Sequence, residues 1–198
     1  MNRLQSLLQE DQPPASWSAI IFDYDRTIAT IPIDWAGVRK ELVCWLKDCH
    51  QIEAPQLTRA DELEAWAIHA AGLNPIEVFA PRRRAESAVS GQHEPNPEVV
   101  SLIHGLRTSV PCPPLFIISN NLRETVLSGL RSLGLEDAFA RVLGVDDSLD
   151  PKPGVGAFEI LGVHHALAPA TTLFFGDSDA TDGLFCSRLG IKFINVSP

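Results

Sequence analysis

The chain has 198 residues, of which 45% are hydrophobic, and it carries a formal net charge of -9 from 25 Asp and Glu against 16 Lys and Arg. Its length fits one domain, or one domain with a modest insertion, because domains average ~150 residues. The surplus of negative charge repels phosphate backbones and argues against a general nucleic-acid binder, and an anionic substrate needs a metal ion or selected Lys and Arg side chains to offset that charge locally.

The N-terminal stretch gives no sign of export or membrane insertion. Acidic and Pro residues interrupt residues 1–14, where a signal peptide keeps an apolar core, and no run in the chain approaches the ~20 apolar residues of a membrane span. The four cysteines form neither a CxxC pair nor a zinc spacing, so we expect scattered reduced thiols. These features predict a cytoplasmic protein with no membrane partner and no nucleic-acid partner.

The first predicted strand, residues 19–22, is apolar throughout. Continuous rather than alternating apolarity is typical of a strand that is buried on both faces of a parallel sheet. In the region that follows, residues 31–94, apolar residues recur at helical spacing and no run looks like a strand. We therefore expect a helical insertion after the first strand.

Three helices are predicted in this insertion. In the first, apolar residues recur at three- and four-residue steps over residues 35–49, and Asp34 is placed as the N-cap. The second and third helices are predicted over residues 59–71 and 75–90.

Two features of the insertion could serve a substrate but favour a structural role. Trp35 and Trp45 lie at helical spacing, which is more typical of a core than of a binding pocket. Arg82, Arg83 and Arg84 form a charge run, which is typical of a solvent-exposed face.

Four further apolar runs predict the rest of the sheet. They cover residues 115–118, 141–145, 172–175 and 192–196. Helices are predicted around them over residues 97–108, 122–133, 155–161 and 179–189. The alternation of strand and helix predicts a doubly wound α/β domain with a parallel sheet. This core domain takes residues 1–30 and 95–198, and residues 31–94 form a small all-helical cap.

Acidic side chains follow two of the predicted strands. Asp23 and Asp25 come directly after the first strand, and Asp177, Asp179 and Asp182 follow the fourth. Because ligands of an open parallel sheet bind at the carboxyl ends of its strands, we expect these acids at one site. Carboxylates brought together repel one another unless a divalent cation lies between them, and Mg²⁺ is the usual cation for a few oxygen ligands plus phosphate.

Four motifs resemble those of the haloacid dehalogenase superfamily, in the same order along the chain. Residues 23–27, Asp-Tyr-Asp-Arg-Thr, resemble its DxDxT signature, although many relatives have Gly at the position of Arg26. The strand that ends in Ser119 resembles the second motif, and Lys152 in an Asp-Pro-Lys-Pro loop resembles the third. Gly-Asp at residues 176–177, followed by a further acid, resembles the fourth.

The resemblance implies a Rossmann-like core with a helical cap, and it implies roles for the matching residues. Asp23 would be the nucleophile, attacking phosphorus to form an aspartyl-phosphate. Asp25 would be the general acid and then the base that activates water. Ser119, Asn120 and Lys152 would bind the phosphoryl oxygens.

The same resemblance implies the Mg²⁺ ligands. Asp23 and Asp177 would bind the ion through their side chains and Asp25 through its backbone carbonyl. Asp182 would complete the metal site, with Asp179 as the rival candidate.

The function expected from these features is a Mg²⁺-dependent phosphatase acting on a small phosphate ester. Two alternatives remain: a phosphomutase or phosphotransferase, in which the aspartyl-phosphate passes to a sugar, and a non-catalytic binding protein that retained the fold. A dehalogenase is disfavoured because that branch needs neither Mg²⁺ nor the second acid of the DxD pair, and a receiver domain is disfavoured by the motif order and the size of the insertion.

Overall fold

The computed structural model describes Leu4, residues 16–109 and residues 111–197. The stretch 1–14, where the sequence predicts no signal peptide, lies outside the described residues except for Leu4. Within the described ranges, no helix combines the length and apolar character needed to cross a bilayer.

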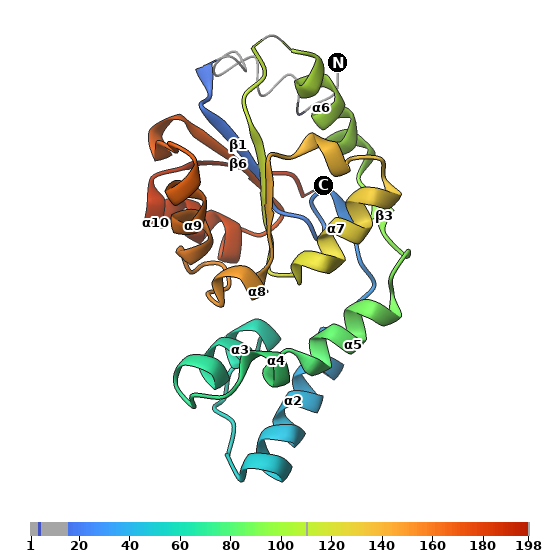
Figure 1. Cartoon of the computed structure of the whole chain (residues 1–198), viewed down its shortest axis with the longest axis vertical. Coiled ribbons are helices and arrows are strands. Elements are labelled where there is room, and N and C mark those ends of the chain that lie inside the picture. Colours follow the sequence, from blue (N-terminus) through green and yellow to red (C-terminus); the bar gives the residue numbers. More distant parts are fainter. Residues whose placement is uncertain (1–3, 5–15, 110, 198) are drawn as a thin grey trace.

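A five-stranded sheet with parallel pairing throughout forms the centre of the larger part of the molecule (Figure 1). Its spatial order is β5 (Arg141–Leu143), β4 (Leu115–Ile118), β1 (Ala19–Phe22), β6 (Thr172–Gly176) and β7 (Lys192–Asn195). Every residue of β1, β4 and β6 is buried, as continuous apolarity predicts for strands covered on both faces. The five predicted strands agree with the observed ones to within two residues at each end.

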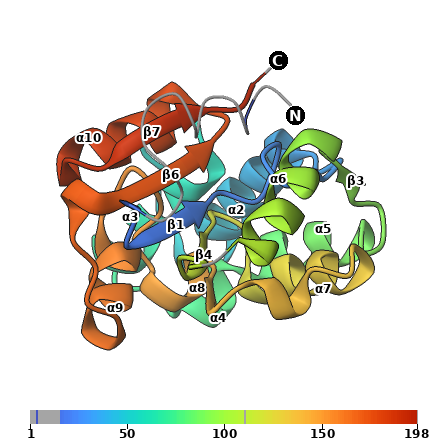
Figure 2. The same cartoon turned by 90° about the horizontal axis from the view of Figure 1, so that it is seen from above.

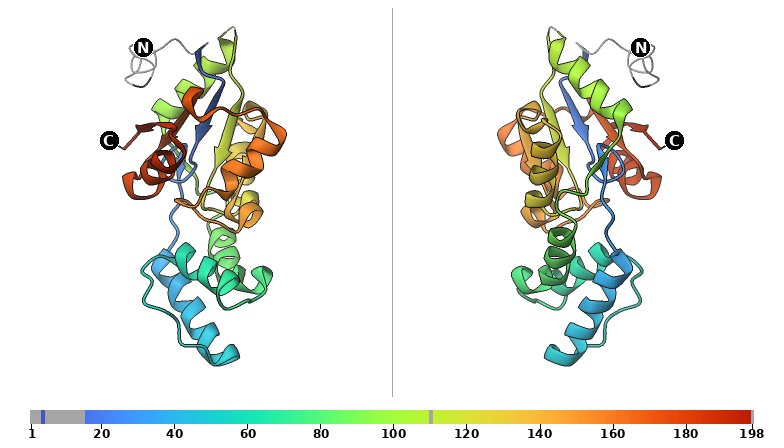
Figure 3. Two further views of the ribbon diagram at one scale, coloured as in Figure 1. Left: turned by 90° about the vertical axis from the view of Figure 1, so that its left-hand side faces the viewer. Right: turned by 90° about the vertical axis from the view of Figure 1, so that its right-hand side faces the viewer.

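Helices cover both faces of this sheet, and the two views of Figure 3 look at the molecule from these two sides in turn. On one face, α6 (Pro97–Thr108) and α7 (Arg123–Ser132) pack on Ile20, Phe22 and their neighbours. On the other, α9 (Gly156–His164) and α10 (Leu184–Leu189) pack on Ile21 and Phe116. The shorter helical elements of the α/β part are α8 (Val145–Ser148), η2 (Glu136–Ala138), η3 (Pro169–Thr171) and η4 (Asp179–Gly183). The predicted doubly wound α/β fold is confirmed.

Residues 35–88 form a separate layer of helices, which we call the helical segment. It consists of α2 (Trp35–His50), α3 (Ala60–His69), α4 (Pro75–Val78) and α5 (Ala80–Ala88). Figure 1 shows it below the sheet, and the view from above in Figure 2 shows its helices beneath the strands. Asp34 caps α2 as predicted, since its Oδ1 accepts the Gly37 N–H at 2.9 Å.

Two short strands that the sequence does not predict flank the helical segment. Ala29–Thr30 forms β2 and Glu94–Pro95 forms β3, and they pair antiparallel with Ala29 opposite Pro95. A two-residue strand is too short to show any alternation of apolar residues, so no sequence pattern marks it. Through this pairing the chain leaves and re-enters the α/β part at adjacent points.

The predicted third helix of the insertion is wrong in one respect, because it is broken in two. The break lies at Phe79, between α4 and α5 (φ -80°, ψ 0°). Pro81 has no N–H to continue a helix that began at Pro75, but proline is tolerated in the first turn of a new helix. The chain therefore starts α5 at Ala80.

One apolar cluster joins the helical segment to the α/β part. Leu42, Leu46 and Leu63 of the helical segment are fully buried in it, and Leu122 before α7 and Val145 at the start of α8 also belong to it. Trp45 packs against this cluster, as its spacing predicts. The helical segment thus shares a core with the loops at one end of the sheet.

Candidate active site

The loop after β1 places two carboxylates at the end of the central strand. The Asp23 N–H donates to the Phe175 carbonyl of β6 at 2.8 Å, which extends the strand pairing by one residue. A tight turn follows, in which the Tyr24 carbonyl accepts N–H groups from residues 27–29 and Arg26 adopts a positive φ of 58°. Asp25 is held by the Ile31 N–H, which donates to its Oδ1 at 3.0 Å.

The loop after β6 brings two more carboxylates to the same point. Asp182 lies in η4 and is buried, and its Oδ2 accepts the Ser178 N–H at 3.2 Å. Gly176 permits this approach, because a Cβ at that position would lie only 2.4 Å from Oδ2 of Asp182. Asp177 is half-buried beside them. The rival candidate Asp179 is exposed and accepts a hydrogen bond from Asn195 at 2.8 Å instead.

Three of these acids form a cluster that fits a metal ion. Asp23, Asp177 and Asp182 each contribute a carboxylate oxygen, and these oxygens lie within 4.8 Å of one another. Burial raises the pKa of Asp23 to about 7, against the opposing effect of Lys152, and burial together with Asp182 raises the pKa of Asp177. Buried carboxylates this close to one another are stabilised by a hard cation such as Mg²⁺, which prefers oxygen ligands.

Lys152 lies within this acidic cluster. Its Nζ donates to Oδ1 of Asp23 at 2.7 Å and to Oδ1 of Asp182 at 2.6 Å, and only 3% of the residue is exposed. Burial by itself lowers the pKa of Lys152, but the two carboxylates outweigh burial and raise it, so the ammonium stays charged. Asn120 holds the loop in place, because its Oδ1 accepts the backbone N–H of Lys152 at 2.8 Å.

The loop after β4 carries the remaining predicted residues. Asn120 lines the cavity described below, and so does Asn121, which the sequence did not single out. Ser119 is buried and is not among the lining residues. Its hydroxyl donates to Oδ1 of Asn121 at 3.1 Å, so Ser119 orients the neighbouring amide in this structure.

A cavity of about 410 Å³ lies where these loops meet the helical segment. The α/β part contributes Asp23, Asp25, Arg26, Asn120, Asn121, Lys152, Asp177, Ser178, Thr181 and Asp182. The helical segment and the loop before α3 contribute Trp35, Ala36, Thr58, Arg59, Ala60, Asp61 and Arg82. The core prediction for Trp35 is wrong: this side chain is half-buried and lines the cavity, because it lies on the first turn of α2, where the helix faces the sheet.

Arg82 is buried, which corrects the prediction of a solvent-exposed Arg run. Arg83 and Arg84 are exposed, but neighbouring residues on a helix point in different directions, and Arg82 points inward. Its Nη2 donates to Glu64 at 2.6 Å and its Nη1 to the backbone carbonyl of Asn120 at 2.7 Å. The guanidinium also lies over the ring of Trp35, 4.6 Å from its centroid.

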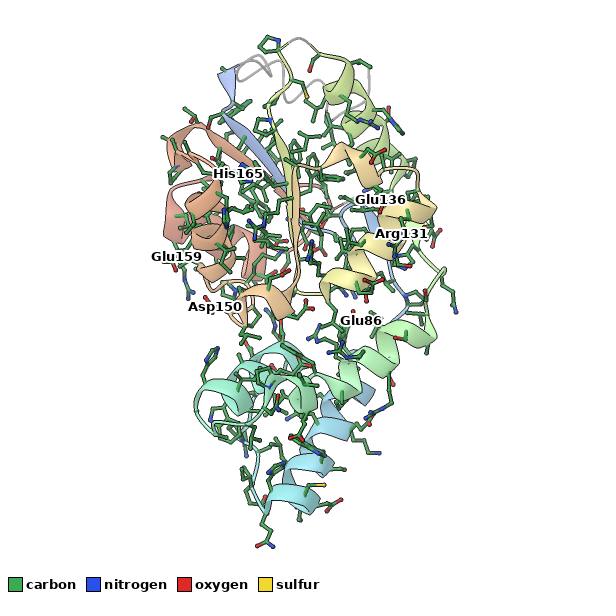
Figure 4. All side chains as sticks on the ribbon, viewed as in Figure 1. Glu86, Arg131, Glu136, Asp150, Glu159 and His165 are labelled. Carbon is green, nitrogen blue, oxygen red and sulfur yellow. The ribbon has the colours of Figure 1, made fainter. Side chains whose placement is uncertain are left out.

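Glu86 makes the second tie between the helical segment and the loop after β4. Its carboxylate accepts the backbone N–H of Leu122 at 3.1 Å, together with hydrogen bonds from Asn121 and Thr125. Leu122 is the N-cap of α7, so Glu86 satisfies a free N–H at a helix start. Figure 4 shows Glu86 where α5 meets the α/β part.

Arg59 and Asp61 make a third tie that the sequence did not reveal. The two side chains form an ion pair, and Oδ2 of Asp61 accepts a hydrogen bond from Asn120 at 2.7 Å. Nη2 of Arg59 donates to the Lys152 carbonyl at 3.3 Å. The sequence signal was only an acidic first turn of a helix, which is ordinary in helices that face solvent.

The sequence also matches a known protein family. The sequence pattern of the family described as haloacid dehalogenase-like hydrolase matches residues 20–196. The chain belongs to this family. The match confirms the family predicted from the four motifs, and with it an enzyme of the hydrolase class.

Solved structures of other proteins share the fold of this hydrolase. The HAD-hydrolase YfnB from Bacillus subtilis, bound to magnesium, is 19% identical with a TM-score of 0.57, over 89% of this chain and 87% of that one. A predicted phosphoglycolate phosphatase from Haemophilus somnus 129PT is 21% identical with a TM-score of 0.57, over 91% and 85%. A haloacid dehalogenase-like hydrolase from Bacteroides fragilis is 18% identical with a TM-score of 0.59, over 90% and 87%. No curated protein matches the sequence.

Proposed function

We propose that this hydrolase is a Mg²⁺-dependent phosphatase that acts on a small phosphorylated metabolite through an aspartyl-phosphate. The observation that carries the proposal is the position of Asp23 on the cavity, in contact with Lys152 and clustered with Asp177 and Asp182. A phosphatase needs a nucleophile, a group to protonate the leaving oxygen, and positive charge for the phosphoryl oxygens. Each has a candidate on this cavity.

The carboxylate cluster is the proposed Mg²⁺ site. Asp23, Asp177 and Asp182 would hold the ion, together with the backbone carbonyl of Asp25. The donor set consists of oxygens alone, which suits Mg²⁺, and the fold is shared with YfnB, whose structure holds magnesium. When bound, Mg²⁺ supplies positive charge that offsets the negative charge of the phosphoryl oxygens.

Asp23 is the proposed nucleophile. A carboxylate oxygen of Asp23 attacks phosphorus, the bond between phosphorus and the ester oxygen breaks, and an acyl phosphate forms on Asp23. Thr27 Oγ1 donates to Oδ2 of Asp23 at 3.4 Å, and Lys152 Nζ donates to Oδ1. Hydrogen bonds therefore orient both oxygens of the carboxylate. Holding the nucleophile in one geometry removes part of the entropic barrier to attack.

Asp25 is the proposed general acid and base. It lines the same cavity as Asp23, and burial raises its pKa, which favours the protonated form that an acid needs. Asp25 gives its proton to the leaving alkoxide oxygen. It then takes a proton from the water that attacks the acyl phosphate, which releases inorganic phosphate and restores the Asp23 carboxylate.

Lys152 and Asn120 are the proposed phosphate-binding residues, with Ser119 supporting them. Lys152 is the charged donor nearest the nucleophile, and the Asn120 side chain fixes its backbone. The Ser119 hydroxyl donates to Oδ1 of Asn121 in this structure. It would have to rotate away from Asn121 to bind a phosphoryl oxygen.

Residues 31–94, which contain the helical segment, are the proposed cap. It supplies one wall of the cavity through Trp35, Thr58 and Arg59. A wall of this kind excludes water while the leaving group departs, and it contacts the part of the substrate that is not phosphate.

The test is release of inorganic phosphate from p-nitrophenyl phosphate and from a panel of phosphorylated metabolites, with Mg²⁺ and with EDTA. Asp23→Asn keeps the shape of the side chain and removes the nucleophile, so we expect at least a ~10³-fold loss of kcat. Asp179→Asn is the matched control, because Asp179 is an exposed acid on the same loop system and lies outside the carboxylate cluster. Unchanged activity in Asp23→Asn would refute the covalent mechanism.

A further inference from the structure

Four cationic side chains line the cavity: Arg26, Arg59, Arg82 and Lys152. Three of them are paired with carboxylates of the chain, Arg59 with its neighbour in α3 and the other two within the buried networks already described. Arg26 differs, because no ion pair or side-chain hydrogen bond joins its guanidinium to any other residue in the part of the chain that the structure describes. It is exposed at the cavity and available to a ligand.

The backbone at Arg26 is in a conformation that Gly adopts without cost. Its φ is 58°, in the left-handed region, where a side chain crowds the neighbouring carbonyl. The turn requires this conformation, since the Tyr24 carbonyl accepts three N–H groups and the Arg26 N–H donates to the Ala29 carbonyl at 2.8 Å. An unfavourable backbone conformation beside a cavity is a reason to look for a function in the side chain.

Arg26 is the neighbour in the chain of the residue proposed to act on the leaving group. It directly follows Asp25, the proposed proton donor to the leaving oxygen, and both residues line the cavity. The proposed phosphate-binding ammonium, Lys152, is in contact with Asp23 and Asp182 instead. The Arg26 guanidinium opposes the rise in the pKa of both Asp25 and Asp177, so it lies near both carboxyls, and its place directly after Asp25 is what associates it with the leaving group.

We propose that Arg26 is a specificity-determining residue that binds an anionic group, a carboxylate or a second phosphate, on the alcohol that leaves. The assignment rests on the proposed phosphatase function. A guanidinium group binds carboxylate and phosphate through two parallel hydrogen bonds, and in a chain of net charge -9 it supplies the local positive charge that a second anion in this cavity needs. The substrate class is then a small phosphate monoester with a second negative charge.

The experiment compares three substrates that differ in one group of the leaving alcohol. Glycerol 3-phosphate carries a hydroxymethyl group, 3-phosphoglycerate a carboxylate and glycerol 1,3-bisphosphate a second phosphate. For each we would measure kcat/KM and the inhibition constant against p-nitrophenyl phosphate hydrolysis, so that binding is measured even where turnover is slow. The wild type is expected to prefer at least one anionic compound over glycerol 3-phosphate, and which one it prefers identifies the anion.

Three variants separate the charge of Arg26 from its backbone. Arg26→Gly is expected to lower the preference for the anionic compound about tenfold, and Arg26→Lys to lose only part of it, because Lys keeps the charge without the paired donors. The melting temperature of Arg26→Gly should equal or exceed that of the wild type, since Gly suits the positive φ. Arg83→Ala is the control, an exposed Arg on α5 that does not line the cavity.

The outcomes separate this inference from the proposed function. If the wild type hydrolyses none of the phosphate esters, p-nitrophenyl phosphate included, the phosphatase proposal fails and the inference fails with it. Arg26 does not select the leaving group if hydrolysis occurs but the wild type shows no preference for an anionic leaving group. The same holds if Arg26→Gly lowers kcat/KM equally for all substrates. The inference is then overturned while the phosphatase proposal stands.

Discussion

Asp23 is a buried acid that lies close to two other carboxylates, Asp177 and Asp182. Its protonation should therefore make the free energy of unfolding depend on pH. Burial and Asp182 raise its pKa to about 7 despite Lys152, whereas an Asp in the unfolded chain titrates near ~3.9. An acid with a raised pKa binds its proton more tightly in the folded state. Its contribution to stability is therefore present below pH ~4 and is lost as the pH rises through about 7.

We expect the metal-free protein to lose stability relative to Asp23→Asn between pH ~4 and ~8, because the variant has no carboxylate to ionise at this position. Mg²⁺ should reverse the trend and raise the melting temperature of the wild type more at pH 8 than at pH 5, since the cluster must be ionised to bind the ion. Thermal unfolding in EDTA and in Mg²⁺ across this pH range measures both effects. The melting temperature of Asp179→Asn should change with pH as that of the wild type does. If the melting temperatures of Asp23→Asn and the wild type change with pH in parallel, the raised pKa of Asp23 is contradicted.

For single residues, the sequence predicted which acids lie together better than it predicted the hydrogen bonds of individual side chains. The spacing of the acids at two strand ends placed Asp23, Asp177 and Asp182 together, since carboxyl ends of parallel strands share one edge of the sheet. It could not predict that the Ser119 hydroxyl lies on Asn121. That choice depends on side-chain torsions in a loop, and torsions leave no periodic trace in a sequence.

The helix α5 contributes a buried ion-pair network on which the free energy of unfolding should depend. Arg82 is the buried cation between Glu64 and Glu86, and 2% or less of each of these two glutamates and of Arg82 itself is exposed. Burial raises the pKa of both glutamates, and Arg82 opposes this effect. Removing Arg82 leaves two buried carboxylates without their cation, which is far more costly than losing an exposed ion pair.

We therefore expect Arg82→Met to lower the free energy of unfolding by about 3–5 kcal/mol. Arg84 lies on the same helix as Arg82 and forms an exposed ion pair with Glu41 of α2, and Arg84→Met should cost less than about 1 kcal/mol. Adding Glu64→Met to Arg82→Met should recover part of the loss, because one uncompensated carboxylate is removed with it. Urea unfolding of the four proteins gives these values, and an Arg82→Met variant as stable as Arg84→Met would show that the network is not stabilising.

The helical segment is the part of the fold that the sequence predicted least completely. Its first helix and the N-cap Asp34 followed from apolar spacing, but the break at Phe79 and the inward position of Arg82 did not. Amphipathic spacing shows only that a helix has a buried face. Which partner covers that face, and whether a buried position holds a charge, is decided by residues distant in the sequence such as Asn120.

The described molecule consists of two parts, the helical segment and the α/β part, which share one boundary. The helical segment and the α/β part enclose the cavity between them, and the tie formed by Arg82 and Asn120 crosses the boundary beside it. The apolar cluster also crosses it, because Leu122 and Val145 of the α/β part are buried against Leu42 and its neighbours. A cap that depended only on its linkers would have none of these contacts, so the two parts should unfold together.

The tryptophans allow this to be measured. Trp17 is buried in the α/β core, while Trp35, Trp45 and Trp66 belong to the helical segment. In a Trp17→Phe protein, fluorescence therefore reports on the helical segment and far-ultraviolet circular dichroism on the whole chain. The indole N–H of Trp17 is buried with no hydrogen-bond partner among the described residues, so this replacement removes no hydrogen bond seen in the structure.

In that background we expect the fluorescence and circular dichroism transitions in urea to coincide. Leu42→Ala empties a fully buried position of the shared cluster and should lower the free energy of unfolding by about 2–5 kcal/mol, with both transitions moving by the same amount. Lys47→Ala, an exposed position on the same helix, should leave both within about 0.5 kcal/mol. A fluorescence transition that precedes the loss of circular dichroism would instead mean that the helical segment opens alone, and that the ties at Asn120 and Leu122 are too weak to join it to the sheet.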